Sequence, residues 1–155
     1  MKLPNIRFAL PKDMPKVVEL CQAHAAYEQS TYSLEGKVEQ LTRYFFDTPA
    51  IAYCLLAEID QQIVGYATFM KQFSTWDAAF YLYLDCLYFE PEARGKGLGK
   101  LVMDYVWAFA KAENCFQIQW QTPEFNKNAI GFYKKIGATA KSKERFFWLV
   151  ENELT

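Results

Sequence analysis

The spacing of apolar residues changes along the chain, and these changes predict both strands and helices. Residues 5–10 alternate weakly between apolar and polar side chains and suit a first strand. From Val17 to Glu28 the apolar residues recur at helical spacing, with Asp13 as a candidate N-cap. A second helical pattern follows and extends to Phe45, with Ser33 as its candidate N-cap. Two helices before the second strand argue against a simple alternation of strand and helix.

Strand patterns then dominate the middle of the chain. Residues 51–59 and 63–70 are rich in aliphatic and aromatic side chains and predict a hairpin around a turn at residues 60–62. The stretch at residues 73–77 is irregular. An apolar, aromatic central strand then occupies residues 81–89.

The last part of the chain adds two helices and further strands. One helix runs to about Lys111, and an alternating strand covers residues 115–121. A second helix begins at Asn126 and is stopped by Gly137. Residues 139–150 suggest a closing strand pair or a bent strand. The whole order predicts an α+β fold, in which helices cover a mixed sheet.

A glycine-rich loop, RGKGLGK at residues 94–100, separates the central strand from the next helix. A helix start presents N–H groups that lack partners, and its dipole favours an anion. Glycines let a ligand approach the main chain closely. The loop is neither a Walker A motif nor the GxGxxG fingerprint. It therefore predicts a pyrophosphate cradle, with a plain turn carrying solvated lysines as the alternative.

Composition and charge exclude several classes of protein. At 155 residues and 52% hydrophobic, the chain suits one domain, residues 1–155, with one sizeable core. The 17 basic and 18 acidic residues give a net charge of −1, which argues against nucleic-acid and membrane-surface partners.

The cysteines and the single histidine bear on metals and on location. Four widely spaced cysteines without a CxxC, together with one histidine, make a zinc site an unfavoured interpretation. We interpret them as reduced thiols of a cytoplasmic protein. The N-terminus lacks a signal-peptide core, and no apolar run approaches the length that spans a membrane.

Two motifs carry a resemblance to a known family. Arg94-x-x-Gly97-x-Gly99 after an apolar strand resembles the acyl-CoA-binding motif of the GNAT N-acyltransferase superfamily. The stretch from Asn126 to Ala138, NKNAIGFYKKIGA, is similar to a second motif of that superfamily. Within it, the chain most resembles the diamine (spermidine/spermine) N-acetyltransferases and their amino-acid-acetylating relatives.

This resemblance implies a fold, a cosubstrate and an assembly. The fold would be a single-domain, mostly antiparallel mixed sheet flanked by helices, with a splayed central strand pair. A bulge in the central strand would open a gap for the thioester. The cosubstrate would be acetyl-CoA, with no metal, and the protein would be a homodimer with residues 146–148 as a candidate interface.

The resemblance also implies which residues bind the cosubstrate. They are the backbone of the central strand's end, the glycine-rich loop and one asparagine: Leu87, Tyr88, Phe89, Arg94, Gly95, Lys96, Gly97, Leu98, Gly99, Lys100 and Asn126. The backbone N–H near Leu87 would polarise the acetyl carbonyl.

Two side chains are candidates for catalysis. Tyr133 would be the general acid for the CoA thiolate, because a phenol with a pKa near 10 is close in acidity to a thiol. The alternative is an ordinary core tyrosine. Asp85 is the candidate base, acting through water on an amine that arrives protonated.

Other residues near these positions have substrate or structural interpretations. Tyr27, Glu28 and Asp85 are candidate substrate-binding residues, with the two acids supplying negative potential for a cation. For Glu28 a solvated helix-end acid is the alternative, and for Tyr27 a core position. His24 is interpreted as an ordinary half-buried helix histidine. Cys86 is rejected as a nucleophile, because no partner histidine is indicated.

Two departures from the polyamine enzymes leave the amine open. Asp85-Cys86 stands where those enzymes carry two acids, and Trp76-Asp77 is spaced differently from their substrate aromatic. The leading hypothesis is direct acetyl transfer to a small cationic amine: a diamine, polyamine or amino acid. The alternatives are a protein or peptide N-acetyltransferase and a catalytically silent acyl-CoA-binding module. A nucleotide-phosphate enzyme is less favoured, because no Walker lysine is present.

Overall fold

The computed structural model describes residues 3–151 and divides after Gln121 into two compact units. The first unit holds most of the regular structure: β1 (Pro4–Phe8), η1 (Pro11–Asp13), α1 (Met14–Tyr27), α2 (Lys37–Phe46), β2 (Tyr53–Ile59), β3 (Gln62–Ser74), β4 (Ala79–Phe89), η2 (Pro91–Ala93), α3 (Leu98–Ala112) and β5 (Ile118–Gln119). The second unit contains α4 (Lys127–Lys135).

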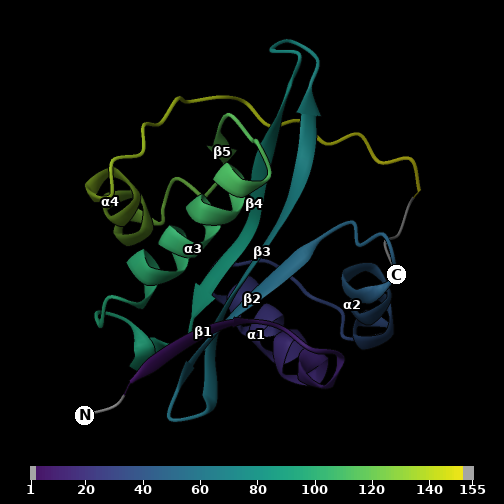
Figure 1. Ribbon diagram of the computed structural model, residues 1–155, viewed down its shortest axis with the longest axis vertical. Helices are drawn as coiled ribbons and strands as arrows, with labels where there is room; N and C mark the ends of the chain where they lie inside the picture. The colour runs from purple at the N-terminus through teal and green to yellow at the C-terminus, as the bar shows by residue number, and fades with distance from the viewer. Residues whose placement is uncertain (1–2, 152–155) are drawn as a thin grey trace. The chain divides into compact units, whose positions relative to one another are not determined.

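The first unit is built on one five-stranded sheet in the order β1-β2-β3-β4-β5 (Figure 1). The first four strands pair antiparallel to their neighbours, and β5 pairs parallel to β4. The long hairpin of β3 and β4 extends beyond the shorter strands (Figure 1). The sheet confirms the predicted α+β class with mostly antiparallel pairing.

Helices cover both faces of this sheet. On one face, α1 and α2 pack against a buried cluster that includes Leu20, Leu56 and Tyr66. On the other face, Phe109 of α3 contacts Phe69 of β3, with ring centroids 5.0 Å apart. Leu55 and Leu56 are adjacent in β2, so their side chains point to opposite faces of the sheet. Both side chains are buried. This pattern is typical of a sheet buried on both sides.

A bulge interrupts the pairing of β3 with β4 at Asp85. Phe69 pairs with Leu84, but the preceding residue of β3, Thr68, pairs with Cys86. Asp85 is therefore the extra residue of this bulge, as the resemblance implied for the central strand.

The ladder between β4 and β5 is short. It comprises Leu82 with Ile118 and Tyr83 with Gln119, so within residues 3–151 it stops just before the bulge. The predicted strand at residues 115–121 is thus confirmed only over two residues. The end of β4, residues 84–89, continues past this ladder. This is the splayed strand pair of the expected fold.

Two sequence predictions about the ends of elements were wrong. Residues 139–150 form no strand, because no described strand pairs with them and an isolated strand has no hydrogen-bond partner. Ser33 does not cap α2, which begins four residues later. Gly36 stands at its N-cap with a φ of 72°, a conformation that suits glycine.

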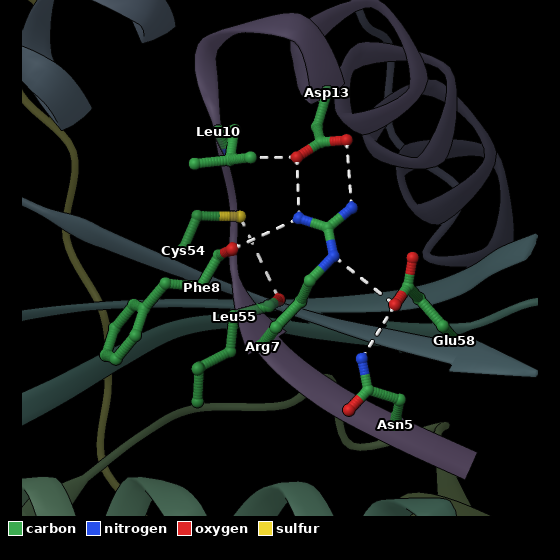
Figure 2. Close-up of polar contacts among 8 residues, drawn as sticks. All are labelled: Asn5, Arg7, Phe8, Leu10, Asp13, Cys54, Leu55 and Glu58. Carbon is green, nitrogen blue, oxygen red and sulfur yellow. Dashed lines mark hydrogen bonds and ion pairs between the residues drawn. The ribbon is translucent and has the colours of Figure 1, made fainter. Parts of the chain in front are cut away.

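Asp13 precedes α1 as predicted, but its carboxylate does not cap that helix. It accepts two hydrogen bonds from the guanidinium of Arg7, at 2.8 and 3.1 Å, and one from the N–H of Leu10 at 2.7 Å (Figure 2). Glu58 of β2 pairs with the same guanidinium at 3.3 Å. The bond with Arg7 lowers the pKa of Asp13. This network ties β1 to the start of α1.

Candidate active site

The glycine-rich loop leads from η2 into α3 through two left-handed residues. Gly95 has a φ of 74° and Gly97, the N-cap of α3, a φ of 81°. The N–H of Leu101 donates to the carbonyl of Gly97 at 3.2 Å. The N–H groups just before Leu101 lie at the helix start, where the helix offers them no acceptor and its dipole favours an anion. The anion-site prediction rests on this backbone geometry and stays a prediction.

The side chain of Arg94 is held in place by one hydrogen bond and by two aromatic rings. Its Nε donates to the carbonyl of Phe89 at 2.9 Å, and its guanidinium carbon lies 4.7 Å from the ring centroid of Tyr27 and 5.3 Å from that of Tyr88. The Arg94 side chain therefore joins the loop to the end of α1 and to β4.

The two loop lysines differ in their surroundings. Lys100 forms an ion pair with Asp104, one turn further along α3. Lys96 is exposed and borders a hollow lined by Pro4, Ile59 and Leu98. The loop's positive charge thus lies on a surface that solvent reaches.

Asp85 and Cys86 have opposite environments on the bulge. Asp85 is exposed, whereas Cys86 packs against the buried cluster under α1. Burial, followed by the charge of Asp85, raises the pKa of the Cys86 thiol to about 12. A thiol with that pKa carries almost no thiolate at neutral pH, which agrees with its rejection as a nucleophile.

The end of α1 brings an acid, a histidine and an aromatic ring to β4. Tyr27 makes an edge contact with Tyr88, with centroids 6.2 Å apart. His24 is half-buried as predicted, and its Nε2 lies 2.7 Å from Oε2 of Glu28. The predicted substrate residues Tyr27 and Glu28 therefore both lie at the end of α1, where the Tyr27 ring contacts Arg94.

The hydrogen-bonded partnership of His24 was missed in the sequence. Its Nδ1 lies 2.9 Å from Oη of Tyr66, a buried residue of β3. A signal was available, because His24 and Glu28 are four residues apart and so neighbours on one helix face. The contact with β3 depends on tertiary packing, which helical spacing does not reveal.

The second unit holds the other two predicted site residues, and we describe it by itself. Asn126 is the N-cap of α4, and its Nδ2 donates to Oγ1 of Thr122 at 3.1 Å. Tyr133 lies in the last turn of α4, and its ring centroid is 5.4 Å from that of Phe132. The N–H of Ala138 donates to the Tyr133 carbonyl at 3.0 Å, next to Gly137 with a φ of 102°. The predicted helix start and glycine stop are confirmed.

The described residues contain neither a metal-binding cluster nor a membrane-spanning helix. Within residues 3–151, no group of three His, Cys, Asp or Glu side chains is arranged to hold a metal ion. No helix in the same residues is both long and apolar enough to cross a bilayer.

Comparisons with known proteins agree on one family. The sequence profile of the Acetyltransferase (GNAT) family matches residues 17–138. A thialysine N-epsilon-acetyltransferase of Bos taurus is 30% identical over 146 residues, covering 89% of this chain and 85% of the relative.

Two solved structures share the fold. A possible acetyltransferase from Clostridium difficile 630 has a TM-score of 0.82 at 16% identity, covering 97% of this chain and 99% of the other. An aminoglycoside N-acetyltransferase in complex with CoA has a TM-score of 0.81 at 12% identity, covering 97% of each chain.

Proposed function

Since the chain belongs to the GNAT acetyltransferase family and is an N-acetyltransferase, we propose that it acetylates the primary amine of a small cationic substrate. The acetyl group passes directly from acetyl-CoA in a ternary complex, and the acceptor is a diamine, polyamine or amino acid. One observation carries this proposal. The end of the β4–β5 ladder at Tyr83, the bulge at Asp85 and the glycine-rich loop follow one another along β4 and its exit.

Acetyl-CoA binding is assigned to backbone groups. The main chain of Leu87, Tyr88 and Phe89 lies beyond the β4–β5 ladder and is assigned to the pantetheine arm. The main chain of residues 94–100 is assigned to the pyrophosphate, supported by the left-handed glycines and the helix start. Asn126 completes the proposed set from the second unit. Arg94 contributes by holding the loop, because its guanidinium already contacts two rings.

The proposed chemistry requires the nitrogen to lose two protons and the leaving sulfur to gain one. Asp85, exposed on its bulge, accepts a proton from the ammonium group through water. The neutral nitrogen attacks the thioester carbonyl, a C–N bond forms, and the C–S bond breaks. Tyr133 donates its proton to the leaving thiolate, and the second proton that the nitrogen loses as the amide forms passes through solvent to the tyrosinate. The products are the N-acetylated amine and CoA.

Negative charge supports a cationic acceptor. Glu28 and Asp85 are assigned to the substrate's positive groups, and Tyr27 to a wall of its site. The similarity to a thialysine N-epsilon-acetyltransferase supports a small amine with further polar groups as the acceptor class.

The proposal extends to assembly and location. Residues 1–155 act as one acetyltransferase domain that includes both compact units. The protein functions as a homodimer, and the exposed side chains of Phe146, Phe147 and Trp148 support residues 146–148 as the interface. The location is the cytoplasm, supported by four cysteines that are free thiols.

A thiol-release assay with acetyl-CoA tests this function. Diamines, polyamines, amino acids, aminoglycosides and lysine-containing peptides are the acceptors, and the expected result is CoA release with small cationic amines. CoA release with peptides alone would identify a protein or peptide N-acetyltransferase. Binding of acetyl-CoA without turnover on any acceptor would identify a silent acyl-CoA-binding module.

A further inference from the structure

His24 joins the acidic end of α1 to two strands of the sheet. Its Nδ1 lies 2.9 Å from Oη of Tyr66 on β3, and its Nε2 lies 2.7 Å from Oε2 of Glu28. The imidazole also stacks on Tyr88 of β4, with centroids 5.2 Å apart and planes inclined by 23°. Contacts from α1, β3 and β4 therefore fix both the position and the plane of this ring.

The partners of His24 also determine which of its nitrogens carries the proton. An ionised carboxylate only accepts hydrogen bonds, so neutral His24 donates from Nε2 to Glu28. Its Nδ1 is then an acceptor, and the hydroxyl of Tyr66 donates to it. Burial, followed by the neighbouring thiols of Cys86 and Cys21, raises the pKa of Tyr66, so its hydroxyl keeps the proton that it donates. Donation therefore runs in one direction, from Tyr66 through His24 to Glu28.

The helix itself does not favour an acid at this position. Glu28 is the C-cap of α1, where the helix dipole favours a cation and disfavours a carboxylate. The Glu28 side chain is 31% exposed, whereas the His24 side chain that holds it is only 13% exposed. The more buried His24 thus holds the solvent-accessible carboxylate of Glu28 in one orientation. That arrangement suits the binding of a cation arriving from solvent.

We propose that His24 is a positioning residue, which holds the Glu28 carboxylate where a second cationic group of the amine substrate binds. This inference rests on the proposed function and deepens it. His24 acts through Glu28 and touches neither acetyl-CoA nor the reacting nitrogen. Its contribution is to discriminate between a diamine and a monoamine of the same length.

Two substitutions separate the contacts of His24. His24→Gln reaches the ε position and keeps an N–H for Glu28, whereas His24→Asn ends at the δ position and keeps only the contact with Tyr66. We expect His24→Asn to raise KM for 1,3-diaminopropane about ten-fold, the effect of one charge-assisted hydrogen bond, and KM for propylamine less than about two-fold. His24→Gln should retain diamine selectivity. The kcat and the KM for acetyl-CoA should stay near wild type in both variants.

The tautomer provides a readout that does not depend on activity. His24 is the single histidine of the chain, so its ring ¹⁵N signals are assigned without ambiguity. We expect the Nε2-protonated form in the neutral protein and a loss of that preference in Glu28→Ala. Protonation at Nδ1, or a diamine-to-monoamine KM ratio unchanged by His24→Asn, would overturn the inference. Failure of the wild-type protein to acetylate any small amine would instead overturn the proposed function.

Discussion

The guanidinium of Arg94 lies over the ring of Tyr27, with Cζ 4.7 Å from the ring centroid. This contact joins the glycine-rich loop to the last residue of α1, and the next residue in the chain is Glu28. The proposed pyrophosphate site and the proposed substrate acid are therefore connected through one arginine and one tyrosine. A substitution of Arg94 should therefore affect the end of α1, and a substitution of Tyr27 should affect the glycine-rich loop.

Removing the Tyr27 ring should destabilise the loop. Tyr27→Leu is expected to lower the free energy of unfolding by about 1 kcal/mol, the size of a partly exposed cation–π contact. Tyr27→Phe keeps the ring and is the control, and it should lose less stability than Tyr27→Leu. Urea unfolding followed by circular dichroism measures both. Equal losses in the two variants would show that the hydroxyl, and not the ring, carries the contact.

The backbone of Gly97 should be sensitive to a side chain. Its φ of 81° is left-handed, and an added Cβ would meet no heavy atom within 4 Å among the described residues. Gly97→Ala should therefore cost about 1–2 kcal/mol in backbone strain alone and weaken acetyl-CoA binding. Thermal unfolding and calorimetric titration with CoA measure the two effects.

Gly131 is the matched control for this substitution. It lies inside α4, does not have a left-handed φ, and has equal space for a Cβ among the described residues. Gly131→Ala should stabilise the protein by up to about 1 kcal/mol, because alanine is the better helix former. Destabilisation at both positions would contradict the backbone explanation for Gly97.

Asp13 should make stability depend on acidic pH. The bond with Arg7 lowers the pKa of Asp13 in the folded protein, so its stabilisation is complete above the unfolded value of about 4. That stabilisation is lost as the pH falls from about 4 through the lowered folded pKa. Asp13→Asn should cost about 2 kcal/mol at pH 7 and less at low pH.

An exposed acid provides the control for Asp13. Asp47 lies 3.9 Å from Arg43, with both side chains more than half exposed. Asp47→Asn should change the free energy of unfolding by less than about 0.5 kcal/mol at any pH, since exposed pairs contribute little. Urea unfolding from pH 3 to pH 7 compares the variants, and parallel pH profiles would argue against the Asp13 assignment.

Tyr133 should affect turnover more than binding. Tyr133→Phe removes the proposed proton donor, and we expect kcat to fall by about 10²-fold, a typical contribution of general acid catalysis. The Kd for acetyl-CoA should remain unchanged. Tyr105→Phe, on an exposed tyrosine of α3, is the control and should keep full activity. Wild-type kcat in Tyr133→Phe would remove this residue from the mechanism.

Local patterns predicted most elements but not the contacts between them. The spacing of apolar residues located α1, the β2–β3 hairpin and α3, because each buries a face whose period is visible in the sequence. The end of α4 at Gly137 was also predictable, because it depends on the conformation of a single glycine. The placement of Arg94 over Tyr27 was not predictable in this way, because it joins residues far apart in the chain.

The wrong predictions have a common physical cause. Residues 139–150 contain strand-forming side chains, but a strand also needs a partner with free backbone groups, and propensity does not supply one. Asp13 has the residue type of a helix cap, yet Arg7 and Leu10 compete for its carboxylate. The competing partner comes from tertiary packing, which residue type alone does not encode.

The bulge in β4 has a consequence for deletions. Leu84 pairs with Phe69 and Cys86 with Thr68, so these four residues already match a regular ladder without Asp85. Deleting Asp85 would therefore leave every remaining side chain of β4 on its present face of the sheet. Deleting Leu87 would instead move the side chains at one end of β4 to the opposite face. The sheet could thus do without Asp85, and the carboxylate occupies a position that folding alone does not require.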